Sequence, residues 1–352
     1  MHSQRWRLTP HPSNLSVVKI ARKRSRDVDG IESMSGRRLL PIAPWRLLGG
    51  ASAALPILMY HRVLEALDPL QDEVHTTQVL ERQFATLSRW FKVLPLDEAV
   101  QMLQEGRLPA RAVCLTFDDG YRDNHDLALP LLQRHGLTAT FYVTSGLLNG
   151  GVMFHDLIAE TVRHAPSGRL DIGVAGVPAV ELSDAASRVR AVATLTPKVK
   201  YLDVPQRLAC TERMMQALGS RAPRHLMMDD AHVTAMSRAG MGIGGHTVNH
   251  QILAKLSDED AAREIEQNRQ DLASLVDKPL TSFAYPNGKP VVDYNEQTIR
   301  HVKASGYRHA VATTWGISTA ASKPFELPRF VLNESTPLSI VKRLLRMSVY
   351  PA

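Results

Sequence analysis

The sequence has few cysteines, few aromatic residues and no long uninterrupted apolar run, and these scarcities exclude several classes of protein. Its two cysteines, Cys114 and Cys210, cannot form a disulfide framework in 352 residues. Cys114 lies in an apolar segment, where a free cysteine behaves as a small hydrophobic residue. Residues 42–59 are mildly apolar, but Arg46 and prolines interrupt them, and a membrane helix needs roughly 20 apolar residues. No transmembrane segment is therefore expected.

Positive charge is concentrated at the N-terminus. Residues 1–50 hold ten of the 42 Lys and Arg residues and three of the 35 acidic residues. The remaining chain carries 32 of each, so it is neutral and offers no basic groove for nucleic acid. Residues 1–54 are expected to be a basic, disordered leader. This leader lacks the apolar segment and cleavage site of a secretory signal, which favours a cytoplasmic protein.

A short apolar run, Ala112 to Phe117, ends in two adjacent carboxylates, Asp118 and Asp119, followed by Gly120. The run is rich in β-favouring residues and too short for a typical helix, so it is predicted to be a buried strand. The tips of parallel strands are where α/β folds gather their chemistry. Two carboxylates at one tip repel each other unless a cation or a proton lies between them. An Asp-Gly turn of no further importance is the alternative.

Three more apolar runs end in polar or special residues, which predicts one shared rim. A glycine-rich run leads into His246 and His250, the run from Leu280 ends at Pro286-Asn287-Gly288, and a later segment carries Arg329. Two histidines four residues apart can bind one metal ion, and a carboxylate can complete a three-ligand site with an open water position. Surface helices carry this spacing by chance, but here it follows a predicted strand end.

Strands and helices alternate along most of the chain, which predicts parallel βα units. Residues of about 146–228 break the alternation, because three helical segments separate one strand from the next by far more than an ordinary loop. We interpret this stretch as a helical insertion, with helices expected at Phe154–His164, Asp184–Leu195 and Pro205–Leu218.

The motifs TFDDGY, HTVNH and FAYPNG, in that order, resemble those of the metal-dependent polysaccharide deacetylases, the NodB-homology family or carbohydrate esterase family four. The resemblance runs from about Pro56 to Asn333. It implies an α/β fold, a distorted (β/α) barrel over residues 55–348 that includes the insertion. It also implies a hydrolase that removes acetyl groups from an N-acetylated carbohydrate.

The resemblance assigns a metal site and a base to these motifs. It implies that Asp119, His246 and His250 bind a divalent cation and that Asp118 takes a proton from the attacking water. Zinc is the expected ion for one carboxylate and two imidazoles, and Co²⁺, Ni²⁺ or Fe²⁺ suit the same ligands.

Three further residues are assigned to the substrate. By the family pattern, the backbone N–H of Asn287 stabilises the oxyanion, and Tyr285 belongs to the same motif. Trp315 is expected to wall a pocket for the acetyl methyl group, with an ordinary core tryptophan as the alternative.

The chain departs from the family at three positions. Ala284 replaces an arginine that orients the base, Thr314 replaces an aspartate, and Leu327-Pro328-Arg329-Phe330 lacks the histidine that acts as general acid. Arg329 could replace the missing arginine from a neighbouring strand, although a structural salt bridge is an equal alternative.

The missing histidine leaves the general acid to be found elsewhere. His61 ranks first, because it is predicted at a strand tip within the resemblance. His155, at the start of the insertion, ranks second, and His125 is expected to face solvent.

Two other functions compete with carbohydrate deacetylation. One is hydrolysis of another non-peptide C–N or ester bond on the same fold. The other is a non-catalytic carbohydrate-binding relative, which the presence of Asp118 and all three metal ligands argues against. The low aromatic content of 6% favours short or lipid-linked glycans over long chains. Work on an exopolysaccharide would favour the cell envelope over the cytoplasm.

Overall fold

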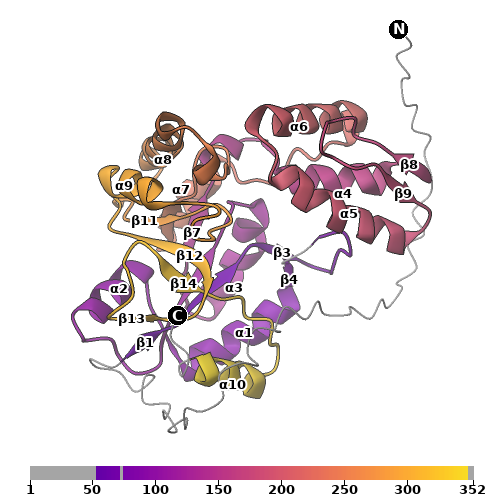
Figure 1. The fold of residues 1–352 in the computed structure, drawn as a ribbon. Helices are drawn as coiled ribbons and strands as arrows, with labels where there is room; N and C mark the ends of the chain where they lie inside the picture. The colour runs from indigo at the N-terminus through magenta and orange to yellow at the C-terminus, as the bar shows by residue number, and fades with distance from the viewer. Residues whose placement is uncertain (1–52, 72–73, 348–352) are drawn as a thin grey trace, which may run out of the picture. The chain divides into compact units, whose positions relative to one another are not determined.

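A computed structural model describes residues 53–71 and 74–347 of the chain. The described residues fall into two compact units, a smaller one at Leu157–Ala222 and a larger one formed by the segments on either side of it (Figure 1). Nearly all of the expected leader, residues 1–54, lies outside the described residues. Each unit is considered by itself.

The larger unit is built on an eight-stranded sheet in which every neighbouring pair is parallel (Figure 1). In spatial order its main strands are β14 (Leu327–Arg329), β12 (His309–Trp315), β11 (Ser282–Ala284), β10 (Gly242–Gly245), β7 (Thr140–Val143), β6 (Ala112–Phe117) and β2 (Ile57–Tyr60). The short β5 (Lys92–Val93) pairs with the start of β6.

Backbone hydrogen bonds bring the two edges of this sheet together. The N–H of Met59 donates to the carbonyl of Phe330 at 3.0 Å, and the N–H of Phe330 donates to the carbonyl of Ile57 at 3.2 Å. The sheet therefore closes on itself as an irregular barrel, because β2 lies beside the segment that follows β14. The predicted distorted (β/α) barrel is confirmed.

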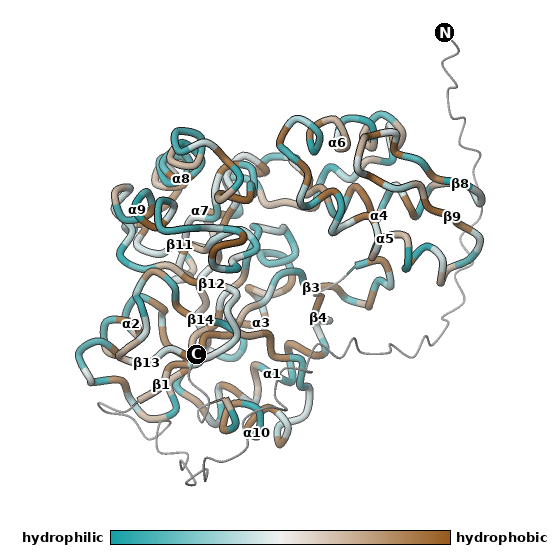
Figure 2. The backbone as a smooth tube through the Cα atoms, in the orientation of Figure 1, coloured by the Kyte–Doolittle hydropathy of each residue, from teal (hydrophilic) through white to brown (hydrophobic). Residues whose placement is uncertain are grey.

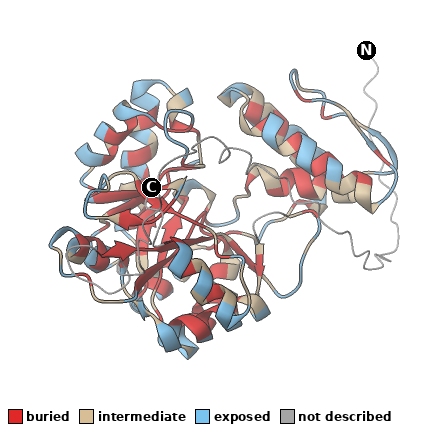
Figure 3. Ribbon diagram, turned by 60° about the horizontal axis from the view of Figure 1, so that its bottom comes forward, coloured by how far each residue is buried: buried red, intermediate tan, exposed pale blue. Residues whose placement is uncertain are grey.

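Side chains on the barrel strands alternate between two apolar clusters, as a period of two requires. Cys114 joins Tyr142, Ala284 and Val311 from other strands in one cluster, which fills the barrel interior. Its neighbours in β6 pack instead with the surrounding helices in the second cluster. Figure 3 shows the strands buried and the outer faces of the helices exposed. The α2 helix (Leu96–Gln104) contributes its apolar side chains to the interior cluster and so covers one end of it.

Amphipathic helices cover the barrel, and Figure 2 shows polar and apolar residues alternating along them. In α1 (Thr77–Trp90), Leu80, Phe84 and Leu87 form a buried stripe with helical spacing. The other helices of this unit are α3 (Leu129–Arg134), α7 (Asp230–Arg238), α8 (Asp258–Ala273), α9 (Glu296–Ala304) and α10 (Pro337–Met347). Among the residues that the structure describes, no helix is long and apolar enough to cross a membrane.

The larger unit also contains two short paired segments and one irregular helix. β3 (Arg62–Leu64) pairs with β4 (Val74–Thr76), and β1 (Ala54–Leu55) pairs with β13 (Ser318–Thr319). A π-helical segment, η2 (Asn124–Ala128), leads directly into α3.

The smaller unit contains the expected helices and a hairpin that was not expected. α4 (Phe154–His164) begins in the larger unit, and α5 (Ala185–Lys200) and α6 (Val204–Leu218) follow. β8 (Gly168–Leu170) and β9 (Val180–Leu182) form an antiparallel pair between them. These strands are three residues long and largely exposed, so they leave no period-two apolar pattern in the sequence.

Candidate active site and metal centre

The two aspartates of the first motif lie at the tip of β6. Asp118 follows the strand directly and is held there by its N–H, which donates to the carbonyl of Tyr60 at 3.0 Å. Asp119 and Gly120 have φ values of 79° and 88°, so the chain turns sharply away from the strand. A Cβ on Gly120 would lie 3.1 Å from a methyl carbon of Val143, and glycine is therefore the residue that fits. Both carboxylates are buried.

The two histidines of the second motif reach Asp119 from a loop and not from a helix. His246 follows β10 directly, and residues 246–250 have no helical structure. Oδ1 of Asp119 lies 3.4 Å from Nε2 of His246 and 3.3 Å from Nε2 of His250. The three ligand atoms are all within 4.8 Å of one another, which suits a single metal ion.

Hydrogen bonding around this cluster fits a metal site. Nδ1–H of His246 donates to the backbone carbonyl of Ala284 at 2.8 Å, which leaves the lone pair of Nε2 directed at Asp119. Burial lowers the pKa of His250 to about 4, against the opposing effect of Asp119. A neutral imidazole is the form that binds a metal. Burial raises the pKa of Asp119, but its interactions with the imidazoles of His246 and His250 outweigh burial and leave the pKa well below its usual value.

Asp118 is held by a buried arginine from the far edge of the sheet. Nη1 and Nη2 of Arg329, at the end of β14, each donate to one oxygen of Asp118 at 2.7 Å. Nη1 also donates to Oγ1 of Thr116, and Nε donates to the carbonyl of Ala312. These bonds fix the plane of the guanidinium, and the guanidinium in turn fixes the carboxylate.

This arrangement keeps Asp118 ionised. Burial would raise the pKa of Asp118, but the positive charge and hydrogen bonds of Arg329 outweigh burial and hold the pKa below its usual value. The structure shows a bidentate ion pair between Arg329 and Asp118, and the role of Arg329 in orienting the base stays a prediction. Ala284, at the position where the family resemblance implies an arginine, is buried in the barrel interior.

The two histidine candidates for the general acid differ in their surroundings. Nε2 of His61 lies 4.0 Å from Oδ2 of Asp118. The carbonyl of His61 accepts a hydrogen bond from Nδ2 of the buried Asn124 at 2.8 Å. Nε2 of His155 is instead engaged at 2.7 Å by the hydroxyl of Tyr121. His61 is therefore the histidine that the structure brings to Asp118.

The third motif forms a tight loop after β11. Asn287 and Gly288 have φ values of 61° and 67°, and Thr313 brackets the loop: its hydroxyl donates to the carbonyl of Asn287, and its N–H donates to that of Gly288. The N–H of Asn287 makes no hydrogen bond with any described residue. Tyr285 differs from the expectation, because its side chain lies in the core. Its ring stacks on Tyr294 with centroids 3.9 Å apart, and its hydroxyl donates to the carbonyl of Phe325.

Trp315 ends β12 and pairs in register with Arg329. Its side chain is 55% exposed and contacts Phe330 and the guanidinium of Arg343. It is therefore not a core tryptophan.

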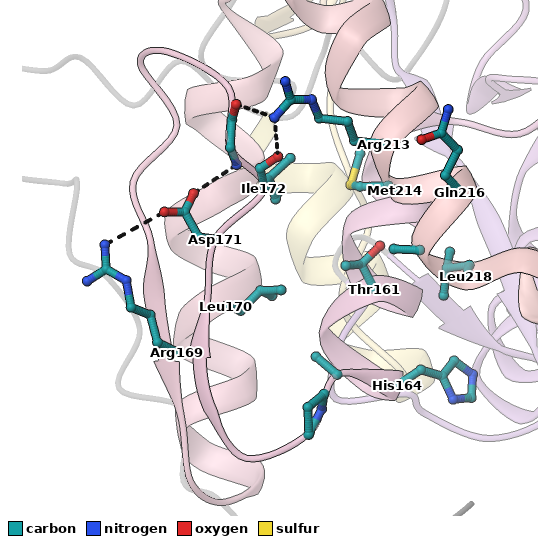
Figure 4. Close-up of a pocket in the computed structure, with 14 residues that line it drawn as sticks. Thr161, His164, Arg169, Leu170, Asp171, Ile172, Arg213, Met214, Gln216 and Leu218 are labelled. Atoms are coloured by element: carbon teal, nitrogen blue, oxygen red, sulfur yellow. Dashed lines mark hydrogen bonds and ion pairs between the residues drawn. The ribbon is translucent and has the colours of Figure 1, made fainter. Parts of the chain in front are cut away.

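A separate pocket of about 750 Å³ lies within the smaller unit, lined in part by Asp171 and Arg213, and none of the site residues reaches it (Figure 4).

One residue that holds the site together was not predicted. Asn268 of α8 is fully buried, and its Oδ1 accepts a hydrogen bond from the N–H of His246 at 3.1 Å. Its Nδ2 donates to the carbonyls of Thr247 and Val143. The available signal was a polar residue within the apolar stripe of a helix, between Ile265 and Leu272.

A family model for the polysaccharide deacetylases matches residues 105–177 and 196–310, together more than half of the chain. The chain belongs to the polysaccharide deacetylase family. The sequence-based assignments of family, of a hydrolase and of a carbohydrate deacetylase are thereby confirmed.

Two curated relatives agree with this assignment. The Bacillus subtilis protein YxkH, a polysaccharide deacetylase by name, is 22% identical over 283 residues, which are 79% of this chain and 71% of that protein. A poly-β-1,6-N-acetyl-D-glucosamine N-deacetylase of Staphylococcus epidermidis is 31% identical over 115 residues, which are 28% of this chain and 39% of that protein.

Solved structures of deacetylases share the fold. The Streptococcus pyogenes deacetylase PplD superposes with a TM-score of 0.56 at 21% identity, over 84% of this chain and 98% of that one. IcaB from Ammonifex degensii gives 0.53 at 15% identity, over 84% and 97%.

Proposed function

We propose that this polysaccharide deacetylase is a metal-dependent N-deacetylase that hydrolyses the acetamide of an N-acetylhexosamine. The observation that carries the proposal is the pair of adjacent aspartates with different partners. Asp119 faces two imidazoles, and Asp118 faces a guanidinium. One carboxylate is thus suited to a metal ion and the other to proton transfer, although the two are neighbours in sequence.

We assign the metal site to Asp119, His246 and His250, with zinc as the preferred ion. The donor set of one carboxylate and two imidazoles supports this choice, as does the hydrogen bond that fixes the His246 ring. A divalent cation held there would polarise the acetyl carbonyl and make a water molecule more acidic.

We assign proton transfer to Asp118 and His61. Asp118 takes a proton from the attacking water, and the two hydrogen bonds from Arg329 hold its oxygens in place for this step. His61 lies 4.0 Å from Asp118, so it can reach the same bound substrate and donate a proton to the departing amine. An amide needs this proton because an amine anion is a poor leaving group. His155 is the weaker candidate, since its Nε2 already contacts Tyr121.

Substrate contacts are assigned to Asn287 and Trp315. The N–H of Asn287, which has no partner among the described residues, is proposed to face the carbonyl oxygen as it gains negative charge. Trp315 is exposed at the end of β12, beside Arg329, and is proposed to contact the acetyl methyl group or the sugar ring. The staphylococcal relative, named for poly-β-1,6-N-acetyl-D-glucosamine, supports an N-acetylglucosamine substrate.

A substrate panel tests this proposal. Acetate release is measured with N-acetylglucosamine oligomers joined by β-1,6 or β-1,4 bonds, and with O-acetylated sugars of the same length. We expect release from the N-acetylated oligomers, and replacing His61 should slow this release more than any release from the esters, because an amine depends more than an alcohol on a proton donor to leave. Release from the esters alone would refute the N-deacetylase assignment and leave an esterase on the same site.

A further inference from the structure

A second group of potential metal ligands lies in the larger unit, outside the site described above. His125, Asp126 and His232 each offer one ligand atom, and the three atoms all lie within 4.8 Å of one another. The two imidazole rings meet edge to face with centroids 4.4 Å apart. The group meets the same distance criterion as Asp119, His246 and His250, and it has the same donor set of two imidazoles and a carboxylate.

Two elements far apart in sequence bring these side chains together. His125 and Asp126 lie in the π-helical segment η2, and His232 lies in the first turn of α7. The two elements are in contact. π-Helical turns are rare and are found often at functional sites, because they display side chains that an α-helix would space differently. The sequence predicted only that His125 faces solvent.

The cap of α7 fixes the side chain of His232. Oδ1 of Asp229, the residue that caps α7, lies 2.7 Å from Nδ1 of His232. Nδ1 of His232 also accepts a hydrogen bond from the backbone N–H of Asp229 at 3.2 Å, as part of the capping box of α7. These two contacts hold the imidazole ring in one orientation.

The group is accessible to ions from solution. The exposed fractions of the side chains are 27% for His125, 42% for Asp126 and 16% for His232. Asp126 uses Oδ2 in an ion pair with Arg122 at 2.9 Å, and its Oδ1 lies 2.8 Å from Nδ1 of His125. The other carboxylate oxygen of Asp126 therefore lies on the histidine side, where it contacts His125.

We propose that His125, Asp126 and His232 form a second binding site for a divalent transition metal, with zinc preferred for this donor set. A metal ion bound there would link η2 to α7. η2 follows β6, which leads into Asp118 and Asp119, and α7 precedes β10, which leads into His246. It is separate from the proposed catalytic metal site, and its existence does not depend on the proposed reaction.

The test counts zinc by elemental analysis after metal-free protein is dialysed against zinc. Four proteins are compared: wild type, the double variant His246→Ala/His250→Ala, His232→Gln, and the combination of all three substitutions. We expect the double variant and His232→Gln each to bind one zinc fewer than wild type, and the combination to bind two fewer. Zinc should raise the melting temperature of the double variant but not that of the combination.

A matched control separates loss of a ligand from loss of a histidine. His135→Gln removes a side chain that is also 16% exposed and also pairs with one carboxylate, Glu81, but lies in neither group. It should bind as much zinc as wild type. Equal zinc content in wild type and His232→Gln, or no difference between the double variant and the combination, would overturn the proposal. A loss of zinc confined to the double variant would also overturn it, because zinc would then bind only at Asp119, His246 and His250.

Discussion

Removing the positive charge of Arg329 tests whether the buried ion pair serves the base. In Arg329→Met, Asp118 loses two hydrogen bonds of 2.7 Å and a neighbouring cation while it stays buried. An adjacent arginine lowers a carboxyl pKa by about 1 to 3 units, so the pKa of Asp118 should rise by about that amount. Because the base must be ionised, the acidic limb of the kcat/KM profile should move to higher pH by about 1 to 3 units.

The same substitution should also lower the rate and the stability. Loss of the fixed carboxylate geometry should reduce kcat by about 100-fold at the pH optimum. Leaving one partner of a buried ion pair unpaired costs about 3 to 5 kcal/mol, which is a large part of a typical domain stability of about 5 to 15 kcal/mol. Denaturant unfolding must therefore show first that the variant is folded under assay conditions.

Two comparison variants separate charge, geometry and stability. Arg329→Lys keeps a positive charge but cannot make both hydrogen bonds, so its rate should fall with a smaller shift of the acidic limb. Arg62→Met breaks another buried arginine pair, with Asp123 and Asp156, and should lower stability while leaving the acidic limb unchanged. A folded Arg329→Met enzyme with a wild-type rate and pH profile would refute a role for Arg329 beyond packing.

Three other outcomes follow from the site. His61→Ala should lower kcat by about 100- to 10,000-fold and His155→Ala by much less, and wild-type turnover in both would refute the assignment of the general acid. Gly288→Ala should lower activity and destabilise by about 1 to 3 kcal/mol, because its φ is 67° and a Cβ would lie 2.8 Å from the N atom of Thr313. Gly136→Ala, with a φ of 63° and open space around it, should be milder in unfolding assays and keep full activity. Trp315→Ala should raise KM for the oligomers more than it lowers kcat, and an unchanged KM would contradict its contact with substrate.

The strand ends and their shared rim could be predicted from sequence because the signal is local. Each motif follows a short apolar run, and the tips of parallel strands lie at the same edge of a sheet. The order of the motifs then brings Asp119, His246 and His250 together. In the structure, Oδ1 of Asp119 lies within 3.4 Å of Nε2 of both histidines. Local pattern also gave α4, whose bounds match the expected helix at Phe154–His164.

The contacts that depend on closure of the barrel could not be predicted in the same way. Arg329 reaches Asp118 only because the end of the sheet returns to β2, and the pairing of β12 with β14 changes register on the way. Tyr285 was expected to contact the substrate, but its ring lies in the core and stacks on Tyr294. Side chains alternate between the two faces of a strand, so a residue next to a site can point away from it. Asn268 supports His246 from a helix 22 residues further along the chain, and no local pattern links the two.

Acetate release by metal-free, zinc-reloaded and Asp118→Asn protein tests the central claim most directly. The substrate is the N-acetylglucosamine oligomer that the wild-type enzyme hydrolyses fastest. We expect chelation to abolish release, zinc to restore it, and Asp118→Asn to stay inactive while it still binds zinc at Asp119, His246 and His250. Undiminished release by the metal-free protein, or by a zinc-loaded Asp118→Asn variant, would contradict the account.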